Sequence, residues 1–340
     1  MSSVKFKLNL AARPSSNKIN YKSKILLMGS CFTENIGGKL DNHLFPNFQN
    51  SHGILFNPVS VQNAITDCIQ NKKYQASDLF LLNEVWNSWH HHSRFSGITQ
   101  EAALEKINES INQAHLFLKT ASHLVITLGS AWLYTLNENA PNGKGQVVAN
   151  NHKAPAQWFT KQLLSPSQLL NNLKVLVADL NQFNPDLKII FTISPVRHLR
   201  EGLVDNNRSK AVLIQALHDF ISNASGDTQM VEYFPAYEYV IDDLRDYRFY
   251  AEDLVHPNYA ATQYVWEQLV ETYMHVDTQL IMKQVAELQL AVNHKPFFAG
   301  SAEHQKFIQS CIEKTIQLQA QIPSISLQNQ LQFFKSQVAK

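Results

Sequence analysis

Short apolar segments alternate with longer amphipathic segments along most of the chain, and this alternation constrains the fold more than any other feature. The apolar segments are residues 24–28 (KILLM), 53–56 (GILF), 123–128 (HLVITL), 188–193 (KIIFTI) and 230–234 (MVEYF). The first, third and fourth are apolar almost throughout, as in strands of a parallel sheet that helices cover on both faces. Helical periodicity marks the intervening residues 59–70, 101–119, 167–182 and 209–224. The pattern predicts a doubly wound α/β sheet.

The pattern changes after about residue 276. Residues 276–293, 302–319 and 327–339 are glutamine-rich helical segments, and no apolar strand is expected among them. We therefore predict an α/β domain over residues 1–275 and a helical C-terminal extension over residues 276–340, which is either a cap or an interaction element.

Composition narrows the functional class. The chain has 340 residues, 44% of them hydrophobic, and a formal net charge of +1. That length is sufficient for an α/β core, and the small charge gives no reason to expect nucleic acid or an anionic membrane as partner. The start lacks the apolar stretch of a signal peptide, and no run reaches the roughly 18 apolar residues of a membrane span. Three dispersed cysteines suggest neither disulfides nor a thiolate metal site. We expect a soluble cytoplasmic protein without a cofactor; the oligomeric state stays open.

Polar residues follow the predicted strands, at the edge where ligands gather in such sheets. They form the segments 29–31 (GSC), 57–58 (NP), 129–130 (GS) and 194–198 (SPVRH). Candidate substrate-binding residues are Gly129, Arg197, His198 and His152. For Arg197 and His198 the alternative is a structural ion pair, for example with Asp205 or Glu201, and for His152 it is an ordinary loop position.

The turn Gly29-Ser30-Cys31 joins the first strand to a helix. A serine there either caps the helix or acts as a nucleophile, which requires a base and a third group that orients the base. Asp253 and His256 supply such a pair, because a three-residue offset in a tight loop can bring carboxylate and imidazole together. Cys31 is a rival nucleophile, since thiols at helix N-termini have lowered pKa values. We expect it instead to pack as a small buried residue behind Ser30.

Six segments together resemble the GSCFA family of SGNH/GDSL-type hydrolases. They are GSCF (29–32), GILFNPVS (53–60), ITLGSAW (126–132), NNHK (150–153), SPVRH (194–198) and DLVHPN (253–258). The resemblance covers roughly residues 5–275, with Thr33 where the family's name has alanine. It implies a flavodoxin-like three-layer α/β/α domain with a mostly parallel sheet. It also implies ester hydrolysis through an acyl-enzyme, with Ser30 as nucleophile, His256 as general base and Asp253 as its orienting group.

The oxyanion hole departs from this pattern. SGNH enzymes use an asparagine of a G-x-N-D motif after the third strand, and Ala131 stands there. Losing one oxyanion donor typically costs about 10²–10³ in rate. Candidate replacements are Asn57, Ser130 and Asn151. The expected substrate is a small or carbohydrate O-acyl ester. Two alternatives remain: a catalytically weak binding module, and an O-acyltransferase.

The histidine run at 90–92 invites a metal interpretation. Three consecutive histidines do not readily face one ion, and no cysteine or carboxylate sits at ligand spacing. We therefore expect no metal, and a loop at the rim of the site in which Trp86 and Trp89 offer an apolar or sugar-stacking surface.

Overall fold

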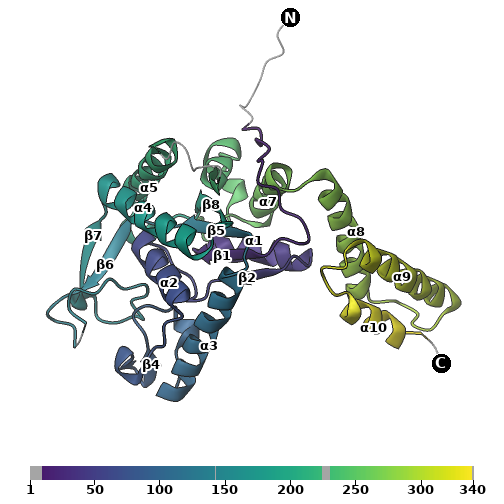
Figure 1. The fold of residues 1–340 in the computed structure, drawn as a ribbon, viewed down its shortest axis with the longest axis horizontal. Helices are drawn as coiled ribbons and strands as arrows, with labels where there is room; N and C mark the ends of the chain where they lie inside the picture. Colours follow the sequence, from purple (N-terminus) through teal and green to yellow (C-terminus); the bar gives the residue numbers. More distant parts are fainter. Residues whose placement is uncertain (1–9, 142, 224–229, 339–340) are drawn as a thin grey trace, which may run out of the picture. The chain divides into compact units, whose positions relative to one another are not determined.

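Two compact units make up the chain in the computed structural model, which describes residues 10–141, 143–223 and 230–338 (Figure 1). Lys24–Gly37 and Phe48–Trp266 form most of the first unit. The second unit comprises Ala12–Ser23, Gly38–Asn47 and Glu267–Lys340. Two segments from the N-terminal part of the chain therefore belong with the C-terminal helices.

The central sheet contains five strands in the order β2-β1-β5-β8-β9. These strands are β1 (Ile25–Gly29), β2 (Asn47–Gln49), β5 (His123–Leu128), β8 (Lys188–Ile193) and β9 (Val231–Phe234). β1, β5, β8 and β9 pair in parallel. Counted along the chain, the order is 2-1-3-4-5, the flavodoxin-like arrangement, in which the strand order reverses between β1 and β5. The doubly wound α/β fold is confirmed.

The strand predicted at residues 53–56 is wrong, because β2 occupies that place in the sheet. Gly53, the first residue of the predicted strand, has φ +81°, which is a turn conformation and not an extended one. The segment then crosses the carboxyl ends of two strands: Leu55 N donates to Gly29 O (2.9 Å), and Phe56 O accepts from Gly129 N (2.8 Å) and Ser130 N (2.9 Å). Its apolar residues thus cover the edge of the sheet at which the polar residues gather.

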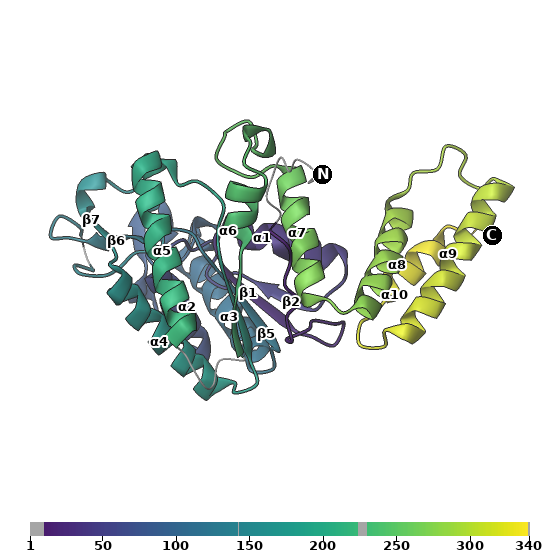
Figure 2. The ribbon, with the colours of Figure 1, turned by 90° about the horizontal axis from the view of Figure 1, so that it is seen from above.

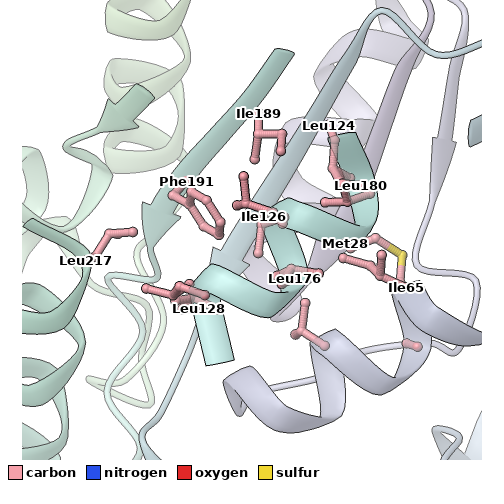
Figure 3. Close-up of a cluster of buried hydrophobic side chains, with 14 of the residues drawn as sticks. Met28, Ile65, Leu124, Ile126, Leu128, Leu176, Leu180, Ile189, Phe191 and Leu217 are labelled. Atoms are coloured by element: carbon pink, nitrogen blue, oxygen red, sulfur yellow. The ribbon is translucent and has the colours of Figure 1, made fainter. Parts of the chain in front are cut away.

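Four helices cover one face of the sheet. They are α2 (Pro58–Gln70), α3 (Gln100–Leu118), α4 (Pro166–Phe183) and α5 (Leu203–Asn223). Met28, Ile126 and Phe191 point from the strands into this layer (Figure 3). Alternate residues of the same strands, such as Leu27 and Val125, are also buried, so the sheet is covered on both faces. The start of α1 (Cys31–Asn42) and of α7 (Tyr259–Tyr273) lies on the opposite side (Figure 2).

Two antiparallel hairpins are additions that the strand pattern does not predict. They pair β3 (Phe80–Leu82) with β4 (Val85–Asn87), and β6 (Trp132–Leu136) with β7 (Phe159–Leu163). One short α-helix is α6 (Ala236–Glu238). The 3₁₀ turns are Ala76–Asp78, Ser93–Phe95, Ala156–Trp158, Leu199–Glu201 and Tyr247–Phe249, and a π-helical turn spans Tyr239–Asp243.

The C-terminal part is helical, as predicted, with α8 (Val276–Asn293), α9 (Ala302–Gln321) and α10 (Gln328–Ser336). N-terminal residues join the second unit through specific contacts. Ser324 Oγ donates to the Tyr21 carbonyl (2.9 Å), and the Tyr21 and Phe45 rings stack with centroids 4.4 Å apart. Within the described ranges, every helix is too short or too polar to cross a bilayer.

Candidate active site

The turn between β1 and α1 lies directly against β5. Gly29 has φ +134°, and a Cβ built there would lie 2.1 Å from Thr127 O, so only glycine fits this position. Gly29 N donates to Asn50 Oδ1 (2.9 Å), and Ser30 N donates to Thr127 O (3.1 Å). The backbone of the turn is therefore fixed from both sides.

We expected Cys31 to be buried behind Ser30, but in the structure Ser30 is the more buried of the two candidate nucleophiles. Ser30 is 0% exposed, and its Oγ accepts a hydrogen bond from Phe32 N (3.3 Å). Cys31 begins α1 and is partly exposed. Burial raises the pKa of the Cys31 thiol, while the backbone N–H groups of Cys31 and Phe32 act in the opposite direction. Cys31 therefore retains some exposed surface, whereas Ser30 has none.

Asp253 and His256 lie together, at the distance of a strong charge-assisted hydrogen bond. Asp253 Oδ2 is 2.6 Å from His256 Nδ1, and Oδ1 accepts from Val255 N (2.9 Å) and His256 N (3.0 Å). These hydrogen bonds lower the pKa of Asp253 to about 2. Because the ionised carboxylate only accepts, His256 Nδ1 must donate, so in the neutral imidazole Nε2 carries the lone pair. His256 Nε2 has no hydrogen-bond partner within the described part of the chain.

Arg197 connects this loop to the end of β8. Its backbone N donates to Val255 O (3.3 Å), and Nη1 donates to Leu254 O (3.2 Å). The guanidinium lies 4.0 Å from the centre of the Tyr250 ring. Arg197 therefore makes neither of the ion pairs considered from sequence: Asp205 pairs with Arg208 instead. We assign Arg197 to positioning the loop that carries His256.

His198 lies beside Gly129, at the end of β5. A Cβ at Gly129 would be 3.1 Å from His198 Nε2, and the His198 ring meets Phe56 edge-on at 5.0 Å. Burial, and then the charges of Lys210 and His256, lower the pKa of His198 to about 3. His198 is therefore neutral at pH 7, and its Nε2 is buried without a hydrogen-bond partner among the described residues.

Lys210 is the functional candidate that sequence analysis missed. It lies on α5, is fully buried, and its Nζ donates to Gly129 O (2.7 Å) and Ser194 O (2.6 Å), at the ends of β5 and β8. Burial lowers its pKa to about 7. The available signal was a lysine on the apolar stripe of the helix, since Leu213 and Leu217 are also buried. A cation there needs partners, and two strand ends provide them.

Stability should therefore depend on pH through Lys210. The native pKa is below the unfolded value of about 10.4, so between about pH 7 and 10 the unfolded chain binds the extra proton. The free energy of unfolding should rise with pH in this window, by at most about 1.4 kcal/mol per unit. Lys210→Met should abolish this rise in urea titrations at a series of pH values. Lys174→Met, at an exposed position of α4, should keep it, and an unchanged slope in Lys210→Met would refute the assignment.

The three predicted oxyanion donors are engaged elsewhere. Asn57 caps α2, with Oδ1 accepting from Ser60 N (2.8 Å) and Nδ2 donating to Ser60 Oγ (3.0 Å). Ser130 Oγ is 3.2 Å from Ser209 Oγ and accepts from Trp132 N (3.2 Å). With its amide oriented to match its neighbours, Asn151 accepts from Arg200 at 3.1 and 3.2 Å. Their side chains therefore have structural partners already.

The histidine run packs inside the first unit. His91 is 0% exposed and stacks on His52 (4.3 Å). His152 Nε2 donates to Ser88 O (2.8 Å), so its ring is held by the backbone before the run. Trp89 is buried against Phe80 (3.6 Å), so the expected sugar-stacking surface at this residue is wrong. In the described ranges, no three histidine, cysteine or acidic side chains come together as metal ligands.

Known structures resemble the chain weakly. An acetyl xylan esterase from Butyrivibrio proteoclasticus is 11% identical, with a TM-score of 0.37 over 74% of this chain and 63% of the enzyme. A carbohydrate esterase family 3 protein from Talaromyces cellulolyticus is 7% identical, with a TM-score of 0.35 over 78% of this chain and 99% of the other. The chain spans just under two thirds of the first enzyme. None of the curated proteins matches.

Family models match two regions. The C-terminal domain model of GSCFA domain proteins matches residues 285–340. The model of the GSCFA family itself matches residues 24–269, which include the β1–α1 turn, Lys210 and the Asp253–His256 pair. The chain therefore belongs to the GSCFA family.

Proposed function

We propose that this protein hydrolyses an O-acyl ester through an acyl-enzyme formed at the β1–α1 turn. The observation that carries the proposal is the Asp253–His256 pair. An ionised carboxylate holds one ring nitrogen at 2.6 Å, and the other nitrogen has its lone pair available at a half-exposed position. This is the arrangement that a general base needs.

Contacts connect the base to the turn across the sheet edge. Arg197 ties the His256 loop to the end of β8, and His198 joins that end to Gly129 of the β5 tail. Ser30 N donates to Thr127 O, which joins the β5 tail to the turn. The strand order reverses between β1 and β5, where ligands of such sheets bind. No hydrogen bond joins His256 to Ser30 among the described residues, so proton transfer requires that substrate binding or a loop movement bring the two side chains together.

The proposed reaction has two stages. His256 Nε2 takes the proton of the nucleophile as the new bond to the acyl carbon forms, and returns it to the leaving alkoxide. Water then attacks the acyl carbon and gives a proton to His256. The bond between the acyl carbon and the nucleophile breaks, the acid leaves, and the nucleophile regains the proton from His256. Sequence analysis predicts Ser30 as nucleophile, and that role stays a prediction.

We assign stabilisation of the oxyanion to groups other than the predicted Asn57, Ser130 and Asn151. His198 Nε2 is buried beside Gly129 without a partner in the described part of the chain, so a proton on this nitrogen is available for donation. Lys210 places a buried cation behind the same glycine. Both lie where negative charge would develop near the β5 tail.

A panel of p-nitrophenyl esters from acetyl to octanoyl, together with acetylated sugars, tests the function. We expect hydrolysis well above the buffer rate, fastest for short acyl chains. Asp253→Asn should lower kcat/KM by about 10²-fold or more, because the imidazole loses its orienting carboxylate. The matched control is Asp246→Asn, an exposed aspartate that accepts from Arg248 N (2.8 Å). A folded protein that hydrolyses none of these esters would refute the proposal.

A further inference from the structure

We propose that Cys31, and not Ser30, is the nucleophile of this site, so that the acyl-enzyme is a thioester. The inference rests on the proposed ester hydrolysis and names the attacking atom. Ser30 and Cys31 are adjacent at the start of α1, but they differ in burial and in hydrogen bonding.

Access separates the two residues. A nucleophile must come within about 3–3.5 Å of the acyl carbon. Ser30 is 0% exposed, and its hydroxyl oxygen already accepts from Phe32 N. Cys31 is partly exposed at the adjacent position. Cys31 therefore borders solvent, whereas a substrate reaches the Ser30 hydroxyl only if the turn opens.

Backbone donors also favour the cysteine. The N–H of Ser30 is used by Thr127 O (3.1 Å), so it does not serve an oxyanion. Cys31 is the first residue of α1, and the first N–H groups of a helix have no intrahelical acceptor. The N–H groups of Cys31 and Phe32 favour the thiolate. The Cys31 N–H, at the positive end of the helix, suits an oxyanion on the acyl oxygen once the acyl carbon is bonded to the sulfur, whereas the Phe32 N–H already donates to Ser30 Oγ.

The buried Lys210 side chain adds electrostatic support to this assignment. The Lys210 ammonium has three protons, of which Gly129 O and Ser194 O accept two. Its charge acts to lower the pKa of Cys31, and a Cys31 thiolate acts to raise the pKa of Lys210, although burial is the larger effect on both groups. The Glu34 carboxylate, on the same helix as Cys31, acts in the opposite direction.

Burial raises the pKa of the Cys31 thiol by more than the N–H groups and Lys210 lower it, so the free thiol keeps its proton. A base, His256, is therefore needed to remove that proton. His256 Nε2 accepts the thiol proton while the S–C bond to the acyl carbon forms. Collapse of the intermediate breaks the C–O bond, and the proton passes to the departing alcohol. Water then adds to the thioester, giving its proton to His256; the C–S bond breaks, the acid leaves and the thiol regains the proton. No oxidant or further reactant is required.

Paired variants test the assignment. Cys31→Ala should lower kcat for p-nitrophenyl acetate by about 10³-fold or more. Ser30→Ala should cost no more than about tenfold, because it removes only the hydrogen bond from Phe32 N. Circular dichroism and thermal melting establish that both variants are folded. The covalent intermediate, quenched in the burst phase, should be released by neutral hydroxylamine, which cleaves thioesters and leaves serine esters intact. Fragmentation mass spectrometry then places the acyl group.

Each result decides a separate question. Loss of activity in Ser30→Ala with retention in Cys31→Ala, or a hydroxylamine-stable adduct on Ser30, overturns this inference and leaves the proposed hydrolysis standing. Absence of all ester hydrolysis refutes the proposed function, and alkylation then decides the role of the thiol.

Iodoacetamide should modify Cys31 faster than it modifies the buried Cys68 and Cys311. In His256→Ala, the modification of Cys31 should be slower than in the wild-type protein by about tenfold or more. Equal rates in the wild-type protein and in His256→Ala overturn the inference; Cys311→Ala, which keeps Cys31, is the control.

Discussion

Replacing His256 with alanine should lower kcat/KM for a short-chain ester by about 10³–10⁴-fold. General acid–base catalysis typically contributes about 10²–10⁴, and the nucleophile here keeps its proton without the imidazole. Because the side chain is half exposed and its Nδ1 contacts only the Asp253 carboxylate, the substitution should leave the melting temperature almost unchanged. Steady-state kinetics and thermal melting of the same samples measure both effects.

The chain offers a matched control for His256. His275 is also exposed and also lies near an aspartate, with Nδ1 3.4 Å from Asp277 Oδ2 in the second unit. His275→Ala should retain full activity. Equal kcat/KM in the two variants would exclude His256 as the base.

Gly29→Ala should lower the free energy of unfolding by about 3 kcal/mol or more. A residue with a side chain at φ +134° is strained, at about 1–3 kcal/mol, and forcing atoms into a packed region costs about 1–3 kcal/mol more. The added Cβ would lie 2.1 Å from a backbone oxygen of β5, which cannot move away as a flexible side chain would. Urea denaturation followed by circular dichroism gives the change.

Gly38→Ala is the corresponding control. Gly38 lies within α1, and a Cβ there meets no atom within 4 Å. Alanine favours helix by about 1 kcal/mol over glycine, so this variant should be slightly more stable than the wild-type protein. A Gly29→Ala protein as stable as Gly38→Ala would show that β1 and β5 separate at their ends more easily than the structure indicates.

Periodicity predicted the buried framework well. The runs at 123–128 and 188–193 coincide with β5 and β8, because a strand buried on both faces must be apolar throughout. The strand prediction at residues 53–56 was wrong for a physical reason. The apolar residues there cover an edge of the sheet instead of joining it, and composition does not distinguish these two kinds of burial. The short strand β2 carries too few residues for a periodic signal.

The site was predictable in part. The Asp253–His256 spacing led to a pair that the structure brings within 2.6 Å, because the contact is local in sequence. Lys210 could not be found this way, since its partners, Gly129 and Ser194, lie on two strands distant from it in the chain. Whether Ser30 or Cys31 is the more exposed depends on the direction that the backbone takes across a single peptide bond. Residue type alone does not specify which of two neighbours faces outward.

The crossing segment at residues 53–56 has a consequence for natural variation. Its hydrogen bonds to Gly29, Gly129 and Ser130 run through main-chain atoms, so the crossing over the sheet edge is held by groups common to nearly all amino acids. Replacement of the partly exposed side chains Ile54 and Phe56 should therefore leave these hydrogen bonds in place, whereas Leu55 is fixed by its position in the core.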